Sequence, residues 1–144
     1  MRETIMVRCG SCGTLNRVDA DKAGVPARCG ECRAEISPGV PVEVTDGNFD
    51  ERVNRSKRPV LLEFWSPSCG HCIRMGPVLD ELAVEMAGRL LVAKLDITKN
   101  PVSSSKFEIQ ATPAFVLMQG GKERLRVMGA MPKDELMEKV RRFV

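Results

Sequence analysis

Blocks of apolar and polar residues alternate from residue 42 onward and predict strands and helices. Residues 60–65 and 90–97 are short, almost continuous apolar stretches, typical of strands buried on both faces. Between them, residues 69–87 are expected to form a helix, with a kink at Pro77, where one backbone donor is missing. The apolar positions of this helix recur at spacings of four, three and four: Met75, Leu79, Leu82 and Met86.

The rest of this region completes an alternating order of strands and helices. Before the first buried strand, we expect a strand at 42–44 and a helix from Thr45 or Asp46 to about Asn54. After the second, we expect a short helical stretch before Ala111 and a hairpin of strands 114–118 and 122–128. Pro132 is expected to open a last helix, which carries Leu136, Val140 and Phe143 on one face. Strands separated by helices imply a partly parallel sheet covered on both faces, and the hairpin makes the sheet mixed. The expected class is α/β.

Residues 1–40 lack such a pattern. Their aliphatic residues are isolated, so this segment cannot bury enough apolar surface to offset its chain entropy without a staple. Residues 37–41, Ser-Pro-Gly-Val-Pro, are typical of a short, stiff connector. We therefore expect two domains, at 1–40 and 41–144.

Composition narrows the class of protein. The 144 residues, 28% of them charged, suit one ordinary domain with a small appendage. No apolar run approaches the roughly 18 residues of a membrane span, and the first residues lack the apolar core of a secretory signal, so we expect a cytoplasmic protein that does not bind membranes. The net charge of +3, with no aromatic residue in 1–40, argues against a nucleic-acid partner.

All six cysteines fall in Cys-x-x-Cys pairs, and the first two pairs have the spacing of a zinc site. Sixteen residues separate the pairs, and Gly10 and Gly30 are expected to permit tight turns. Four thiolates close a tetrahedral site, so the expected cofactor is one structural Zn²⁺, with no organic cofactor. The alternatives are two disulfides or idle thiols. The expected ligands are Cys9, Cys12, Cys29 and Cys32.

The third pair, Cys69 and Cys72, lies between a predicted strand and a predicted helix. The free N–H groups and the dipole at a helix N-terminus stabilise a thiolate, which is the attacking species in disulfide exchange. Cys69 is therefore the expected nucleophile and Cys72 the resolving thiol. The alternative is a third metal-binding pair or two packing cysteines.

Residues 42–144 resemble thioredoxin, and the added cysteine pairs are similar to the zinc-binding subfamily often called thioredoxin 2. The segments that carry the resemblance are Glu63-Phe64-Trp65, Cys69-Gly70-x-Cys72, Pro77, Val92-Ala93-Lys94-Leu95, Thr112-Pro113, Gly129 and, in the N-terminal part, Leu15-Asn16-Arg17-Val18. The resemblance implies the thioredoxin fold, a central mixed sheet flanked by helices, here preceded by a small zinc-ribbon-like domain. It also implies reduction of protein disulfides, with NADPH-dependent thioredoxin reductase as electron donor.

The resemblance also assigns a substrate surface. It places a cis proline at Pro113 opposite the cysteines, leaving the backbone of Thr112 free to pair with an extended substrate; the alternative is an ordinary proline at the start of a strand. Gly129, Ala130 and Met131 are expected to form a flat apolar rim beside it. The expected substrate-binding residues are Trp65, Gly70, Thr112, Pro113, Gly129 and Ala130.

Two charged residues interrupt buried strands. Glu63 matches a family aspartate thought to relay the proton of the resolving thiol, and Lys94 matches a lysine near it. Burial should raise the pKa of Glu63. The two side chains are expected either to serve proton transfer or to form a structural ion pair.

The active-site motif departs from the usual one of thioredoxin. Histidine replaces proline, which gives the Cys-Gly-His-Cys motif of protein disulfide isomerases, and Ser68 replaces a tryptophan. An imidazole that stabilises the Cys69 thiolate would make the disulfide a stronger oxidant, so His71→Pro is expected to make the dithiol more reducing. The alternative is a neutral surface histidine with little effect.

The favoured function is a monomeric thiol-disulfide oxidoreductase that reduces disulfide-containing proteins. One alternative keeps the same residues but runs the exchange as an oxidase or isomerase. Another is a module in which the zinc thiolates sense oxidants or dock a partner.

Overall fold

The computed structural model describes residues 4–9, 11–19, 27–36, 41–86 and 89–144. Most of the expected connector, at 37–40, lies outside these ranges. So do Gly10 and the predicted end of the long helix at residue 87.

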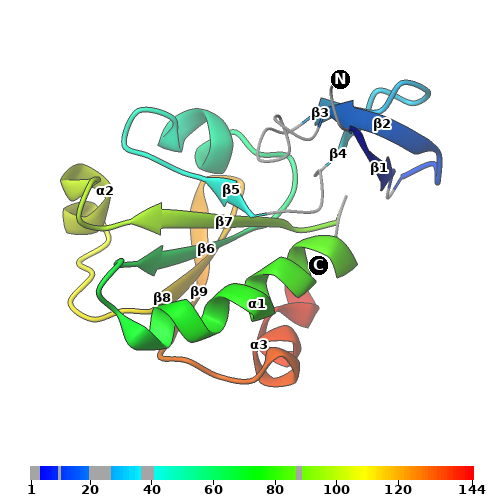
Figure 1. Cartoon of the computed structure of the whole chain (residues 1–144). Helices are drawn as coiled ribbons and strands as arrows, with labels where there is room; N and C mark the ends of the chain where they lie inside the picture. Colours follow the sequence, from blue (N-terminus) through cyan, green and yellow to red (C-terminus); the bar gives the residue numbers. More distant parts are fainter. Residues whose placement is uncertain (1–3, 10, 20–26, 37–40, 87–88) are drawn as a thin grey trace.

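A five-stranded mixed sheet forms the centre of the molecule and confirms the expected class (Figure 1). Its strands lie in the order β5-β7-β6-β8-β9. The first three run parallel, whereas β8 and β9 are antiparallel to their neighbours. The strands are β5 (Val42–Glu43), β6 (Val60–Trp65), β7 (Leu91–Asp96), β8 (Ala114–Gln119) and β9 (Lys122–Met128).

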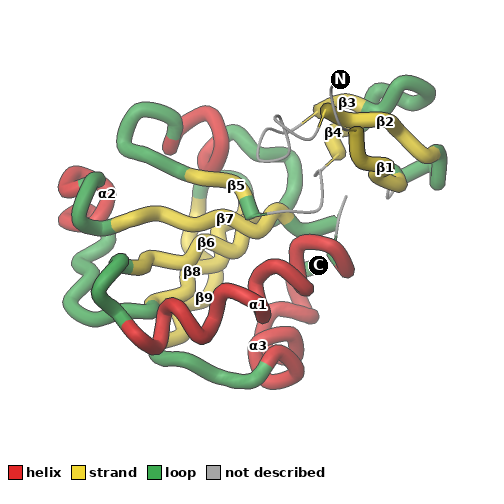
Figure 2. Tube along the Cα trace, viewed as in Figure 1, coloured by secondary structure: helices red, strands yellow, loops and turns green. Residues whose placement is uncertain are grey.

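Helices cover both faces of this sheet, as the alternating order predicted (Figure 2). On one face, α1 and α3 pack over Leu61 and Phe115; on the other, Phe49 and Phe107 pack over Phe64. The helices are η2 (Asp50–Asn54), α1 (Gly70–Glu85), α2 (Pro101–Lys106), α3 (Lys133–Val140) and the short η3 (Arg141–Phe143).

The helix expected from Thr45 or Asp46 begins later than predicted. Its first full turn starts at Asp50, and Thr45 instead closes a turn with Asn48. Asp46 caps a different helix, because its carboxylate accepts hydrogen bonds from the backbone N–H groups of Val102 and Ser103 at the start of α2. A capping residue can serve a distant helix, which chain order alone does not reveal.

The N-terminal region folds as two small antiparallel hairpins, which the hydrophobic pattern did not predict. Alternation is weak here, and the buried centre is small, made mainly of Val7, Val18, Ile36 and two cysteines. Figure 1 places this region well apart from the N-terminal end of α1. Its strands are β1 (Thr4–Arg8), β2 (Leu15–Asp19), β3 (Ala27–Arg28) and β4 (Glu35–Ile36).

Candidate functional site

The turn between β6 and α1 places Cys69 at the first position of the helix. β6 ends at Trp65, the N–H of Cys69 donates to the carbonyl of Ser66, and Cys69 is the N-cap of α1. Its Sγ accepts a hydrogen bond from the N–H of Cys72 at 3.2 Å. The sulfur therefore takes the place that an N-cap oxygen usually occupies, where the helix favours negative charge.

The two thiols of this pair differ in their tendency to ionise. Partial burial opposes ionisation of Cys69, but hydrogen bonds from the Cys72 side chain, from Thr112 and from backbone N–H groups outweigh it and lower the pKa of this thiol. Burial raises the pKa of the Cys72 thiol to about 11, and the hydrogen bond with Cys69 adds to the effect. Cys69 is half-buried and Cys72 fully buried. The arrangement thus provides an accessible nucleophile and a protected second thiol.

The loop before β8 lies against the dithiol. The Thr112–Pro113 peptide bond is cis, and the carbonyl oxygen of Thr112 lies 3.5 Å from Cys69 Sγ. The N–H of Gly129 donates to the carbonyl of Pro113 at 2.9 Å. Ala130 follows as an exposed residue. The structure therefore brings Thr112 next to Cys69 and Gly129 next to Pro113.

Glu63 is fully buried in β6, and neither of its carboxylate oxygens has a hydrogen-bond partner among the described residues. Burial raises the pKa of Glu63 to about 7; the charge of Lys94 lowers it, and that of Cys69 raises it. Lys94 lies beside Glu63 in the neighbouring strand, but within the described part of the chain the two form no ion pair. The Nζ of Lys94 lies 4.8 Å from the ring centroid of Trp65. A direct structural ion pair is thus not what holds Glu63.

His71 is exposed on the first turn of α1, and Arg74 holds its ring. The Nη2 of Arg74 lies 2.6 Å from the Nδ1 of His71. A guanidinium can only donate, so Nδ1 is the acceptor of this hydrogen bond. Only the backbone N–H of His71 acts on Cys69, as one of the hydrogen bonds that lower the pKa of that thiol. Sequence reasoning missed Arg74, although its i+3 position on a helix could have indicated it.

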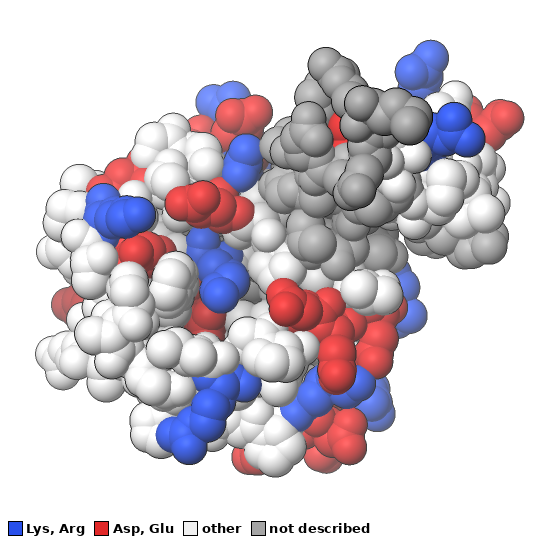
Figure 3. All heavy atoms as spheres, in the orientation of Figure 1, with Lys and Arg blue, Asp and Glu red and all other residues white. Residues whose placement is uncertain are grey.

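Exposed apolar side chains flank the active-site turn. Ile73 on α1 and Met128 at the end of β9 are 64% and 51% exposed, far more than apolar residues of the core. Figure 3 shows mostly uncharged atoms at the end of the sheet where β6 ends and α1 begins. Such a surface suits docking of protein segments with little sequence specificity.

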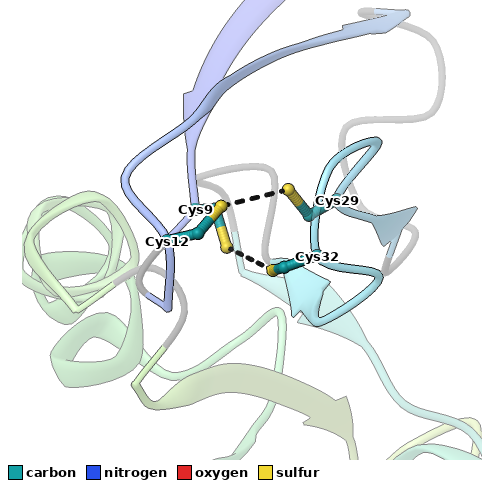
Figure 4. A group of neighbouring side chains, drawn as sticks. All are labelled: Cys9, Cys12, Cys29 and Cys32. Atoms are coloured by element: carbon teal, nitrogen blue, oxygen red, sulfur yellow. Dashed lines mark hydrogen bonds between the residues drawn. The ribbon is translucent and has the colours of Figure 1, made fainter.

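The four N-terminal cysteines converge on one point (Figure 4). The Sγ atoms of Cys9 and Cys32 and those of Cys12 and Cys29 are 3.6 Å apart, and all four lie within 4.8 Å of one another. Tetrahedral Zn²⁺ with Zn–S bonds of about 2.3 Å sets sulfur–sulfur distances of about 3.8 Å. The donor set and its spacing therefore fit a metal ion of this kind.

The two turns that hold these thiols end with the same hydrogen bond and the same left-handed backbone conformation. In each turn the N–H of the residue after the second cysteine donates to the carbonyl of the first cysteine, and that residue is left-handed: Gly13 at φ 79° and Arg33 at φ 65°. Gly30, by contrast, has no positive φ, so the expected need for glycine between the cysteines is wrong for the second turn. The left-handed residue lies after the pair instead.

Backbone N–H groups also stabilise the thiolate form of two of these four sulfurs, those of Cys9 and Cys29, whereas the pKa of the Cys32 thiol is raised to about 11. A hydrogen bond from the backbone of Cys32 lowers the pKa of the Cys29 thiol to about 6, and Asn16 contributes a further bond. The pKa of Cys9 is lowered by hydrogen bonds from the backbone of Cys12 and Ser11. Thiolates are the form that binds metal.

Comparison with known proteins gives the family. The family model for thioredoxin matches residues 40–142, more than half of the chain. The chain belongs to the thioredoxin family. Thioredoxin-type proteins are protein disulfide oxidoreductases, and this chain is an enzyme of that kind.

Three relatives illustrate the extent of the match to the family. Thioredoxin C-3 of Corynebacterium nephridii is 34% identical over 134 residues, 93% of this chain and 92% of the relative, so the match extends into the segment with the first four cysteines. Thioredoxin 2 of Chlorobaculum tepidum is 35% identical over 68% of this chain and 90% of its own. The bifunctional thioredoxin reductase/thioredoxin of Mycobacterium leprae is 42% identical over 69% of this chain, which spans only 22% of that longer protein. Among the described residues of our chain, no helix is long and apolar enough to cross a membrane.

Proposed function

We propose that this thioredoxin-family protein reduces disulfides of other proteins through Cys69 and Cys72. The Cys69 thiolate attacks one sulfur of a substrate disulfide, forming a mixed disulfide and releasing the other sulfur as a thiolate. Cys72, after losing its proton, then attacks Cys69 Sγ and releases the second substrate thiol. The substrate gains two electrons and the enzyme dithiol is oxidised to a disulfide.

The observation that carries the proposal is the position of Cys69 at the N-cap of α1. Its half-buried sulfur accepts the Cys72 N–H at 3.2 Å and lies against the backbone of Thr112. A substrate strand paired with the Thr112 backbone would bring its disulfide to that sulfur. Trp65, Gly70, Pro113, Gly129 and Ala130 would complete the docking surface.

Glu63 is the proposed proton acceptor for the resolving thiol. The pKa of Cys72 is about 11, so few of these thiols are ionised at neutral pH, and the release step needs a base. Glu63 has a pKa raised by burial to about 7 and, among the residues that the structure describes, no hydrogen-bond partner that would fix its proton. Lys94 would tune this carboxyl through its charge.

The proposed electron donor is thioredoxin reductase, which draws its electrons from NADPH. A relative whose name joins thioredoxin reductase and thioredoxin in one chain supports this pairing. The oxidised Cys69–Cys72 disulfide would accept two electrons from the reductase and return to the dithiol.

The oxidase or isomerase direction rests on His71. A protonated imidazole would stabilise the thiolate and raise the potential, but the exposed ring of His71 contacts Arg74 through Nδ1, and only the backbone N–H of His71 acts on Cys69. This arrangement favours the proposal that the dithiol acts as a reductant of protein disulfides. If the histidine nonetheless raises the potential, His71→Pro will lower it, and His71→Ala will separate the effect of the ring from that of the proline backbone.

The N-terminal segment, residues 1–40, is proposed to be a structural zinc domain, as in the zinc-binding thioredoxin 2 subfamily, ahead of a thioredoxin domain at 41–144. Cys9, Cys12, Cys29 and Cys32 would hold one Zn²⁺, which supplies folding energy and closes the small hairpins. Its distance from the active-site turn favours a structural over a catalytic role. Cys12 and Cys32 are exposed, so an oxidant such as peroxide can reach them. Measuring whether peroxide releases the zinc therefore tests the alternative that this domain senses oxidants.

Trapping of the mixed disulfide tests the proposal. With Cys72→Ser, the first attack proceeds and resolution does not, so a disulfide-bonded complex with oxidised insulin should accumulate and disappear on addition of dithiothreitol. Cys69→Ser is the matched control and should trap nothing. Equal trapping by both variants, or by neither, would contradict the assignment of nucleophile and resolving thiol.

A further inference from the structure

A basic cleft lies between the zinc-type turn at 29–34 and the segment that precedes β6. One hollow of about 310 Å³ and an adjoining one of about 250 Å³ share Arg28, Glu35 and Lys57 in their walls. Together the two hollows are lined by six cationic side chains, against two acidic ones, Glu35 and Glu51. The cations are Arg28, Arg33, Arg52, Arg55, Lys57 and Arg58.

Part of this positive charge is not neutralised. Arg55 pairs with Asp50 at 3.0 Å, and Arg58 lies 3.5 Å from Glu35. Arg28, Arg33 and Lys57 are exposed and form no ion pair with any described residue. Concave walls of one charge sign concentrate the electric field and attract ions of the opposite sign.

Arg58 is the unusual member of the cluster. It lines the second hollow, yet the side chain is only 9% exposed, and none of its three guanidinium nitrogens has a hydrogen-bond partner in the described part of the chain. Removing a guanidinium from water without hydrogen bonds is costly, and a single carboxylate at 3.5 Å compensates for it only in part. An anion bound in the hollow would offset part of this cost through its negative charge.

We propose that this cleft binds a small ligand with two adjacent phosphoryl groups. Arginine forks match phosphate oxygens, and each hollow has its own cations: Arg52 and Arg55 in the first, Arg33 and Arg58 in the second. Arg28 and Lys57, common to both, lie where they can contact both phosphoryl groups. The site is formed by both parts of the chain, so its occupant would hold the N-terminal turn against the body of the molecule.

Calorimetric titration of the full, zinc-loaded chain with inorganic pyrophosphate at low salt tests the proposal. Wild type should bind, and affinity should fall steeply with added salt. Lys57→Gln and Arg28→Gln, both at exposed positions, should each weaken binding about tenfold. Arg58→Met should weaken it further, but the two surface variants decide the matter if Arg58→Met does not fold. Arg124→Gln, an exposed arginine on β9 outside the cleft, is the matched control and should bind as wild type.

Three results would overturn the proposal. The first is that pyrophosphate does not bind to the wild type, and the second is that the Lys57, Arg28 and Arg124 variants all bind it equally. The third is that a hexaglutamate peptide binds in place of pyrophosphate, which would assign the cleft to an acidic protein segment. Titration with ADP separates the two sources of the phosphoryl groups. Affinity equal to that for pyrophosphate supports recognition of the phosphates alone, and tighter binding supports a nucleotide.

Discussion

At the residue scale, the chemistry that we propose uses a buried carboxyl near the dithiol. Glu63 lies in the middle of β6, is fully buried, and has no hydrogen-bond partner among the described residues. Such a group favours its neutral form and takes up or releases a proton near neutral pH, since burial raises its pKa to about 7. This property suits proton transfer, and it also affects stability.

Glu63 should make the protein less stable as pH rises. Its pKa is 4.5 when unfolded and about 7 when folded, so its stabilising contribution is complete below pH 4.5 and is lost as pH rises through 7. Between pH 5 and 8, the wild type should lose about 2.5 kcal/mol of unfolding free energy relative to Glu63→Gln. Urea unfolding of the oxidised protein, in which the active-site thiols do not titrate, measures the difference. Parallel pH profiles of the two proteins would contradict the buried, raised-pKa carboxyl.

At the scale of elements, long-range caps connect segments that are distant in sequence. Asp46 follows β5, yet its carboxylate accepts the N–H groups of Val102 and Ser103 at the start of α2, while the amide oxygen of Asn100 accepts the N–H of Asp46. These bonds fix the segment before η2 against α2. The hydrogen bond with the Ser103 side chain and those from the backbone lower the pKa of Asp46.

Asp46→Ala should lower the melting temperature at pH 7 by a few degrees, because it leaves two backbone donors of α2 without a partner. Since the pKa of Asp46 is lowered by folding, its contribution is present above the ordinary aspartate pKa and is lost as pH falls through the lower folded value. The difference between variant and wild type should therefore shrink in acid. Asp134→Ala, at an exposed position of α3, is the control for loss of an aspartate. If the melting temperature of this control falls as far as that of Asp46→Ala, the proposed capping role of Asp46 is wrong.

Elements with a strong hydrophobic period could be predicted from the sequence. β6, β7, the hairpin of β8 and β9, and α1 were found because their buried faces repeat at the strand or helix period. The start of η2 was wrong because Asp46 serves another helix, and the N-terminal hairpins were missed because their strands bury few side chains. At the site, cysteine spacing indicated both thiol clusters. The burial of Arg58 depends on side-chain placement, which no sequence pattern reveals, whereas the i+3 spacing of His71 and Arg74 on a helix could have indicated their contact.

At the scale of the whole molecule, two thiol clusters with different environments lie at separate places. The N-terminal cysteines close a small region with little core of its own, whereas Cys69 and Cys72 lie on a sheet with a large core on each face. Folding of the first region should depend on metal and that of the second should not.

Removal of zinc should therefore unfold residues 1–40 and leave the remainder folded and active. Treatment of the reduced protein with a chelator should release one zinc per chain and expose the N-terminal region to trypsin, while insulin reduction with dithiothreitol as electron donor continues. Cys9→Ser combined with Cys29→Ser should reproduce this behaviour without chelator. Loss of insulin reduction together with the metal would contradict the independence of the two clusters.

The central claim, that Cys69 and Cys72 act as a reductant despite the histidine between them, is tested most directly by the equilibrium reduction potential of this pair. Fluorescence of Trp65, the only tryptophan, should report the change in glutathione buffers. Because the His71 ring contacts Arg74 and only the backbone N–H of His71 acts on Cys69, we predict a potential near the value of thioredoxins, about −270 mV. A potential of about −200 mV or higher would contradict the account and make the chain an oxidase or isomerase.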